Sequence, residues 1–152
     1  MADINIDSLD KKILSLLQAD ARKPYLEIAR ELGVAGGTVN SRVRRLKEAG
    51  VIEGTRLGIN GEKLGYKLSS FIGVTVDQAG MFQAVADQLV KLNEVVEVHY
   101  TTGDYSLFIR VMVQGTNELH ELLSKKIQLI PHVQSTHTLI ILNSLLNRDL
   151  PL

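Results

Sequence analysis

Four basic residues fall within six consecutive positions of the sequence, with no acidic residue among them: Arg42, Arg44, Arg45 and Lys47. Side chains that hydrogen-bond without carrying a charge stand in the same stretch: Thr38, Asn40 and Ser41. Arginine binds guanine O6 and N7 or a phosphate, asparagine binds adenine, and small hydroxyls reach either kind of group. Clustering of such residues predicts contact with double-stranded DNA, although the charges alone fit a solvated helix face equally well.

The same stretch has the pattern of an amphipathic helix. Its apolar stripe is formed by three residues at helical spacing: Val39, Val43 and Leu46. On the opposite side, four polar residues follow the spacing i, i+3, i+4 and i+7: Thr38, Ser41, Arg42 and Arg45. We therefore expect these side chains, flanked by Asn40 and Arg44, to point outward. Gly50 is placed to cap the C-terminal end of the helix.

Two shorter helices are expected ahead of it. Apolar residues at helical spacing predict the first over 8–19, where Asp7 or Ser8 can accept hydrogen bonds from the first amides. The second is predicted to begin at Pro24, whose missing N–H is harmless in a first turn, and to end at Gly33. Two short helices across a turn that contains glycine are typical of a helix-turn-helix.

Residues 51–59 are predicted to form two short strands around a turn. Such a hairpin behind a helix-turn-helix would be a wing. Arg56 lies in this segment and could reach a phosphate, although a single arginine near a turn is more often simply solvated.

The second half of the chain repeats one unit of strand, helix and strand. Four segments are predicted as strands: 68–76, 95–102, 106–113 and 133–142. A helix over 81–92 is expected between the first two strands. Another is expected between the last two, on the stripe Leu119, Leu122, Leu123 and Ile127. The order predicts an α+β fold in which a winged helix-turn-helix domain precedes a ferredoxin-like βαββαβ domain.

Both sides of the last predicted strand carry large apolar residues. Strict alternation places one set on one side, namely Val133, Ser135, His137, Leu139 and Ile141. It places the other set on the opposite side, namely Gln134, Thr136, Thr138, Ile140 and Leu142. A sheet covered by helices on one face ordinarily has polar residues on the other, so this pattern indicates packing between the sheets of two subunits.

Charge is distributed unevenly around a formal net charge of zero. Residues 1–60 hold ten Lys and Arg against eight Asp and Glu, whereas residues 61–152 hold seven against nine. The sequence has no cysteine, which excludes disulfides and thiolate chemistry. No apolar run is long enough to span a membrane and the first residues lack the order of a signal peptide, so we expect a cytoplasmic protein without membrane contact.

The sequence offers little for catalysis. Three of its four histidines, His99, His120 and His137, lie on predicted strands or a helix without the spacing of a metal site. Gly36 and Gly37 are not followed by the Lys-Ser or Lys-Thr of a phosphate-binding loop. We therefore expect no enzyme activity, no metal and no cofactor. The rival interpretation is a stand-alone metabolite-binding or small enzymatic ferredoxin-like domain with a helical extension, against which the basic face over 38–47 argues.

Five segments, in this order and spacing, resemble the Lrp/AsnC family of bacterial and archaeal feast/famine transcription regulators: 9–14, 27–34, 38–52, 64–66 and 100–109. The resemblance implies DNA binding through the helix-turn-helix, dimers formed by the C-terminal domains, and further assembly into octamers or similar discs. It also implies a DNA-binding domain over 1–60, a hinge over 61–67, and an effector-binding and oligomerisation domain over 68–152.

In the family, a free amino acid binds between dimers near two segments. One is the turn Tyr100, Thr101, Thr102, Gly103, Asp104, Tyr105 and Ser106; the other is the start of the last strand, Gln134, Ser135, Thr136, His137 and Thr138. Amides at the glycine could receive an α-carboxylate, and Asp104 could pair with an α-ammonium. Without the resemblance, a plain β-turn explains the first segment equally well. The sequence of this turn is closest to that of the asparagine-responsive branch of the family, so asparagine is preferred over leucine as the effector.

Two positions depart from the family pattern. Ala35 stands where a capping serine is usual, and Gly36 and Gly37 follow it. Alanine cannot accept hydrogen bonds from the first amides, so we expect the basic helix to be less stable by about 1 kcal/mol. Ser106 stands where many members carry an acidic residue.

Overall fold

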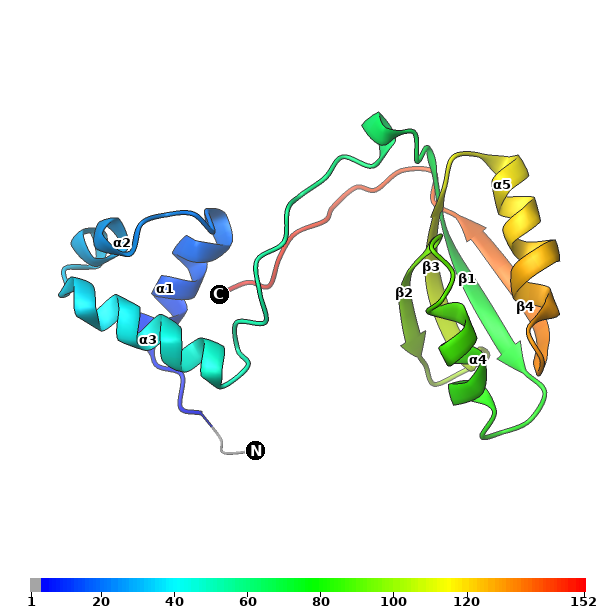
Figure 1. The fold of residues 1–152 in the computed structure, drawn as a ribbon, viewed down its shortest axis with the longest axis horizontal. Helices are drawn as coiled ribbons and strands as arrows, with labels where there is room; N and C mark the ends of the chain where they lie inside the picture. Colours follow the sequence, from blue (N-terminus) through cyan, green and yellow to red (C-terminus); the bar gives the residue numbers. More distant parts are fainter. Residues whose placement is uncertain (1–3) are drawn as a thin grey trace. The chain divides into compact units, whose positions relative to one another are not determined.

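The computed structural model describes residues 4–152, and the chain divides into two compact units (Figure 1). One unit holds the chain up to Gly58 together with Leu146–Leu152, and the other holds Ile59–Leu145. Each unit has its own cluster of buried apolar residues, and the two clusters share no residue. Each unit is therefore stabilised by its own packing.

The first unit contains three helices: α1 (Ser8–Ala19), α2 (Tyr25–Leu32) and α3 (Gly36–Glu48). Their apolar stripes meet in one core, where Ile13, Ile28 and Val39 have no exposed surface. The predicted helix-turn-helix is confirmed, and α1 has the predicted bounds. Pro24 is the N-cap of α2 rather than its first residue, because its ψ of 135° is extended.

Two glycines in the left-handed region end α2 and α3. Gly33 closes α2 with a φ of 66°. Gly50 follows Ala49, the C-cap of α3, with a φ of 72°. Residues other than glycine rarely adopt this conformation. These two positions therefore explain why the helices end so abruptly, as the sequence predicted.

Residues 51–59 do not form the predicted hairpin; within the described chain no strand begins before Leu68. Leu57 and Ile59, which would need a buried face, are 77% and 64% exposed. A two-stranded hairpin without a core to cover is at best marginally stable, and the glycines of the segment weaken it further. Arg56 is exposed on this extended segment.

The second unit is a four-stranded antiparallel sheet in the order β2-β3-β1-β4, with helices in its crossovers. The strands are β1 (Leu68–Val76), β2 (Val95–Tyr100), β3 (Leu107–Val113) and β4 (Val133–Ile140). The helical elements are η1 (Glu62–Leu64), α4 (Phe82–Leu89), α5 (Thr116–Glu121), the π-helical turn η2 (Leu122–Lys126) and η3 (Ile127–Leu129). This is the predicted ferredoxin-like βαββαβ fold.

The sheet has one face covered by helices and one open face. Alternate residues of the central strands, such as Ile72 and Ile109, are completely buried on the covered face. Helical residues with no exposure or almost none belong to the same core: Val85, Leu89, Leu122 and Ile127. The intervening strand residues, such as Phe71 and Phe108, point to the open face.

A bulge changes the alternation at the start of β4. Thr75 pairs with Ser135 but Val76 pairs with Val133, so β4 contains one extra residue, Gln134. Val133 therefore packs against the covered core instead of sharing a side with Ser135, as strict alternation had predicted.

Several elements are shorter than predicted. β2 ends at Tyr100 instead of 102, because the Thr101 hydroxyl donates to the Tyr105 carbonyl and turns the chain (2.9 Å). β3 begins at Leu107 instead of 106, and β4 ends at Ile140 instead of 142. The regular part of α4 covers Phe82–Leu89 instead of 81–92.

Replacing Ala35 with serine should stabilise the first unit. Ala35 is the N-cap of α3, with the extended backbone of a cap and no side-chain hydrogen bond to the helix. A serine hydroxyl there would accept from a first-turn amide, which contributes about 0.5–2 kcal/mol. Urea unfolding of Ala35→Ser should show this gain, and Ala35→Val, which adds volume but no acceptor, should not. A serine variant no more stable than the parent would mean that these amides already have partners.

Candidate functional site

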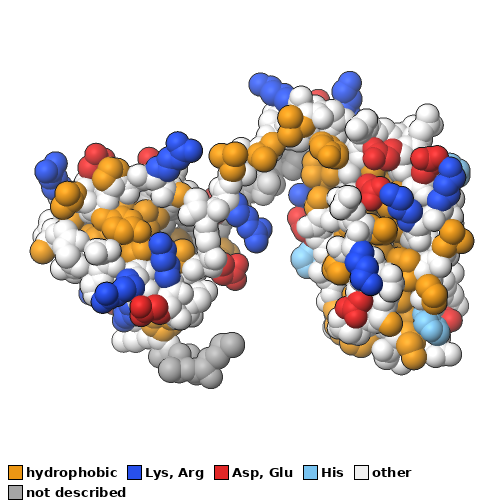
Figure 2. Space-filling view, in the orientation of Figure 1, with side chains coloured by type: hydrophobic (Ala, Val, Ile, Leu, Met, Phe, Trp, Pro, Cys, Tyr) orange, Lys and Arg blue, Asp and Glu red, His pale blue; other side chains and the backbone are white. Residues whose placement is uncertain are grey.

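The residues predicted to contact DNA all lie on α3, apart from Arg56. Five of them are exposed: Asn40, Ser41, Arg44, Arg45 and Lys47. Thr38 and Arg42 are half-buried. The opposite side of the helix is buried through its apolar stripe, as expected. Figure 2 shows basic side chains bordering an apolar patch on the visible face of this unit.

Arg42 and Arg45 do not simply point into solvent, because both bind carboxylates at the start of α1. The Arg42 Nη1 atom donates to Asp7 Oδ2 (2.6 Å) and to Asp10 Oδ1 (2.9 Å). The Arg45 Nη2 atom donates to Asp10 Oδ2 (2.5 Å). Both acids lie more than 30 residues upstream, so the spacing within 38–47 could not indicate these pairs. Both arginines still lie on the side of α3 opposite its apolar stripe, with side chains 27% and 45% exposed.

The two acids are themselves held by the first turn of α1. Asp7 is the N-cap: its Oδ1 accepts from the Asp10 amide (2.8 Å), and Asp10 Oδ2 accepts from the Asp7 amide (3.1 Å). This reciprocal capping box fixes both carboxylates beside α3. The Asp10 side chain has no exposed surface, whereas that of Asp7 is 47% exposed.

Charge pairing shifts the pKa values of this cluster. The hydrogen bond from Arg42, with help from the Asp10 amide, lowers the pKa of Asp7 to about 2 from its ordinary 3.8. Hydrogen bonds to Asp7 and Asp10 raise the pKa of Arg42. The ionised forms of Asp7 and Arg42 therefore stabilise each other.

Arg44 and Lys47 are the other basic residues of α3. The Arg44 Nε atom lies 3.9 Å from a carboxylate oxygen of Glu48, and both side chains are more than 70% exposed. Such an exposed pair contributes little and leaves the guanidinium accessible. Since two carboxylates balance Arg42 and Arg45, the basic surface of α3 is weaker than its sequence suggested.

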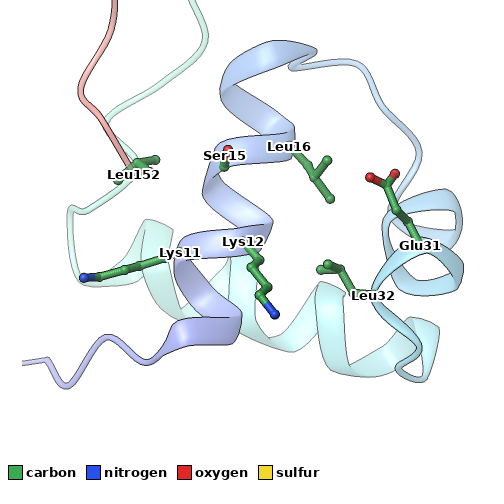
Figure 3. A pocket seen from close by; sticks show the side chains of 7 residues that line it. All are labelled: Lys11, Lys12, Ser15, Leu16, Glu31, Leu32 and Leu152. Carbon is green, nitrogen blue, oxygen red and sulfur yellow. The ribbon is translucent and has the colours of Figure 1, made fainter.

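A shallow hollow is formed by α1, α2 and the C-terminal end of the chain (Figure 3). It is lined by Lys11, Lys12, Ser15, Leu16, Glu31, Leu32 and the last residue, Leu152. A second hollow is lined by residues 114–118. None of the residues predicted to bind an effector lines either hollow.

The predicted effector turn connects β2 to β3 and is tightly held. Ser106 N donates to the Val74 carbonyl (3.0 Å), and the Ser106 hydroxyl accepts from the Val76 amide (3.4 Å). Gly103 has a φ of 111°, a conformation that residues other than glycine rarely adopt. Thr102, Gly103 and Asp104 are exposed, whereas the Ser106 hydroxyl is used to join the turn to β1.

Tyr105 folds from this turn onto the open face of the sheet, above Gly73. A Cβ atom at Gly73 would lie 2.5–2.7 Å from the Tyr105 ring, so only glycine leaves room for it. The ring also lies beside His137 (centroids 5.9 Å apart) and Phe108 (6.2 Å), and Phe108 stacks on Phe71 (5.4 Å). The turn and β4 thus meet in an aromatic cluster on the open face.

The predicted effector residues of β4 divide between the two faces. Ser135 and His137 pair with Thr75 and Gly73 and point to the open face. Thr136 points to the covered face, where Gln128 donates to its hydroxyl (3.3 Å), and Thr138 shares that face. Gln134 is the exposed extra residue of the bulge, and Tyr100 stacks on Phe82 of α4 (4.3 Å). One protomer therefore brings only Tyr105, Ser135 and His137 of the predicted set together on the open face.

Sequence reasoning missed several residues of both regions: Asp7 and Asp10 as partners of the arginines, and Gly73, Phe71 and Phe108 on the open face. The alternation of 68–76 and 107–113 could have indicated the two phenylalanines. Within residues 4–152, no group of three or more His, Cys, Asp and Glu side chains could hold a metal ion. Over the same residues, no helix is long and apolar enough to cross a membrane.

Comparison with known protein families matches both units. Residues 6–53 match the winged helix-turn-helix DNA-binding domain, and residues 69–151 match the Lrp/AsnC ligand binding domain. The chain belongs to the Lrp/AsnC family. Regulatory protein AsnC of Haemophilus influenzae is 47% identical over 146 residues, which cover 96% of this chain and 97% of that protein. Regulatory protein AsnC of Escherichia coli K12 is 41% identical over 150 residues and 99% of both chains.

Solved structures agree with this assignment. The structure of E. coli AsnC superposes with a TM-score of 0.93 at 40% identity, covering 97% of this chain and 99% of that one. A feast or famine regulatory protein from M. tuberculosis, complexed with L-methionine, superposes with a TM-score of 0.84 at 32% identity, covering 94% of this chain and 96% of that one. The chain is a transcription regulator with a DNA-binding domain and an amino-acid-binding domain, and the rival interpretation of a stand-alone ferredoxin-like domain is disfavoured.

The ion pair of Asp7 should make stability depend on pH. Because the pKa of Asp7 is lowered in the folded state, the pair stabilises the fold above about pH 4 and is lost as the pH falls towards 2. The destabilisation caused by Asp7→Asn, which keeps the cap, should therefore be constant above pH 4 and shrink below it in urea unfolding. In an Arg42→Gln background this pH dependence should become smaller, because only the backbone amides then favour the ionised carboxylate. If it persists there at full size, Arg42 is not the group that stabilises the Asp7 carboxylate.

Proposed function

We propose that free asparagine is the effector of this regulator and binds between dimers, at the end of the sheet that holds the turn 101–106 and the start of β4. The observation that carries the proposal is the aromatic cluster around Gly73, which brings Tyr105 of the turn beside His137 of β4. These residues line neither hollow of the single protomer, so a neighbouring dimer would complete the enclosure. This fits an amino acid bound between dimers, as the family resemblance implies.

The chemistry of the turn suits an amino acid. The exposed amides around Gly103 are available to an α-carboxylate, and the exposed Asp104 to an α-ammonium. The Ser135 hydroxyl and the ring nitrogens of His137 offer hydrogen bonds to a polar side chain such as the amide of asparagine. Asparagine is preferred over leucine because the turn resembles that of the asparagine-responsive branch. The methionine complex of the M. tuberculosis relative supports an amino acid as the chemical class.

We also propose that two protomers pair their open faces and that such dimers assemble into an octamer or a similar disc. The open face carries the Phe71 and Phe108 stack, and Leu139 beside Phe71 is 46% exposed. Antiparallel sheets normally present polar residues to water, so an apolar open face favours burial against a second sheet. Identical chains provide the same apolar face on both sides of a two-fold axis.

For DNA we propose that α3 enters the major groove. Its exposed Asn40, Ser41 and Arg44 would face base edges or phosphates, and Lys47 would face phosphates. We also propose DNA contacts for four residues at the edge of this surface. These are Arg42 and Arg45, which are paired with Asp7 and Asp10, together with Thr38 and Arg56. We retain a DNA-binding domain over 1–60, a hinge over 61–67 and an effector domain over 68–152.

The effector proposal predicts a thermal shift with asparagine. At a concentration one hundred times its dissociation constant, the amino acid should stabilise the native state by about 2.7 kcal/mol. A screen of the twenty amino acids should therefore identify asparagine by the largest rise in melting temperature, and sedimentation with and without it should show a change in assembly size. Gly103→Val should abolish both responses, because a β-branched residue cannot adopt its φ of 111° without strain.

Gly80→Val is the matched control. Gly80 has a similar φ of 103° and, like Gly103, has no atom within 4 Å of the point that a Cβ would occupy, but it lies outside the predicted effector turn. It should carry the same backbone strain and still respond to asparagine. A Gly103→Val variant that responds like the parent would move the site away from residues 101–106.

The DNA proposal predicts that Arg44→Ala weakens binding to a duplex selected from a random pool by about 1–3 kcal/mol if Arg44 contacts a base. Binding to a scrambled duplex should change less, because phosphate contacts carry no sequence information. Lys91→Ala, which removes one exposed positive charge from the other unit, should leave both affinities nearly unchanged. Equal losses for Arg44→Ala and Lys91→Ala would remove Arg44 from the interface.

A further inference from the structure

The cluster of Asp7, Asp10, Arg42 and Arg45 pairs two positive charges of the DNA-reading helix with two negative charges of another helix. Three of its bonds cross between α1 and α3, at 2.5–2.9 Å. Arg42 uses only Nη1 in its two bonds, and Arg45 uses only Nη2. Arginine has five N–H donors, so the acids engage one edge of each guanidinium and leave other N–H groups for a second partner.

Asp10 cannot easily release these arginines. Its side chain has no exposed surface, and both of its oxygens accept from a guanidinium. If Arg42 and Arg45 swung away to follow a DNA backbone, a buried carboxylate would lose its countercharges, which is strongly unfavourable. The two guanidiniums therefore stay where α1 holds them when DNA approaches.

We propose that Asp10, with Asp7, is a positioning residue for DNA recognition, which holds Arg42 and Arg45 at fixed places on α3 and keeps their charge from binding phosphates indiscriminately. This inference rests on the proposed DNA-reading role of α3. The arginines then add orientation and hydrogen-bond donors to the interface, but little net charge. The acid pair thereby favours the correct operator over unrelated DNA.

The salt dependence of binding measures this effect directly. Each phosphate neutralised by a basic side chain adds about 0.9 to the slope of log affinity against log salt. Arginines that are paired with Asp7 and Asp10 contribute little to that slope on unrelated DNA, whereas arginines without these ion pairs contribute fully. Freeing both should therefore steepen the slope by about 1–2, so that the ratio of affinities at 50 and 200 mM salt rises about threefold or more per arginine.

The test compares the parent with Asp10→Asn on a selected duplex and a scrambled duplex over a salt series. Asparagine keeps the size of the side chain and an acceptor for the Asp7 amide but loses the charge. We expect Asp10→Asn to bind the scrambled duplex more tightly with a steeper slope, and to lose at least threefold in its preference for the selected duplex. In an Arg42→Gln, Arg45→Gln background, Asp10→Asn should no longer change the slope.

Glu31→Gln is the control, since it removes one negative charge from the same unit and frees Lys23 of its ion pair away from α3. If Asp10→Asn and Glu31→Gln change slope and preference equally, only net charge matters and the inference is wrong. If Asp10→Asn does not fold, Asp7→Asn, which keeps the cap and removes one of the two carboxylates that hold Arg42, should give a smaller effect in the same direction; no effect there overturns the inference. A parent chain that prefers no selected duplex would instead contradict the proposed DNA-reading role of α3.

Discussion

The carboxylate of Asp10 is buried between two helices of the first unit and is bound on both oxygens. It begins as part of a local feature, the capping box of α1, which satisfies amides that every helix leaves free at its start. The same group then orients Arg42 and Arg45 of α3. One side chain therefore joins the start of the first helix to the surface of the third, and the position of α3 depends on a cap more than 30 residues away in sequence.

The second unit depends on the difference between the two faces of its sheet. Helices cover one face of its sheet, and the central strands bury every second residue there completely. The remaining residues, including Phe71 and Phe108, are directed to a face that no helix covers. The bulge at Gln134 changes which face the residues of β4 point to. Val133 packs against the covered core, whereas Ser135 and His137 lie on the open side. The turn 101–106 reaches this face through Tyr105.

Periodicity was sufficient to predict most of this fold. The stripe of Val39, Val43 and Leu46 located α3, and the repeated unit of strand, helix and strand located the sheet, because burial imposes a period on each element. Periodicity could not show that Arg42 and Arg45 bind Asp7 and Asp10, since a helical pattern indicates which side faces outward but not which distant helix lies beside it. The hairpin predicted over 51–59 did not form for a related reason: the local sequence could not show that no core lies beside this segment for Leu57 and Ile59 to cover.

The structure of the candidate effector site could be predicted only in part. Glycine at 103 and the turn around it follow from sequence, whereas the division of 134–138 between two faces depends on a bulge that one extra residue creates. The contact between Tyr105 and Gly73 could not be predicted from the sequence, because the two residues meet only after the sheet has formed. The same reason applies to the ion pairs of Arg42 and Arg45.

The contact between Tyr105 and Gly73 also makes these two positions of the chain interdependent. A Cβ atom at position 73 would lie 2.5–2.7 Å from the ring, whereas the ring can be replaced by a smaller side chain while position 73 remains glycine. The order of substitution therefore matters in any stepwise redesign of this face: position 105 has to be changed first, and position 73 only afterwards.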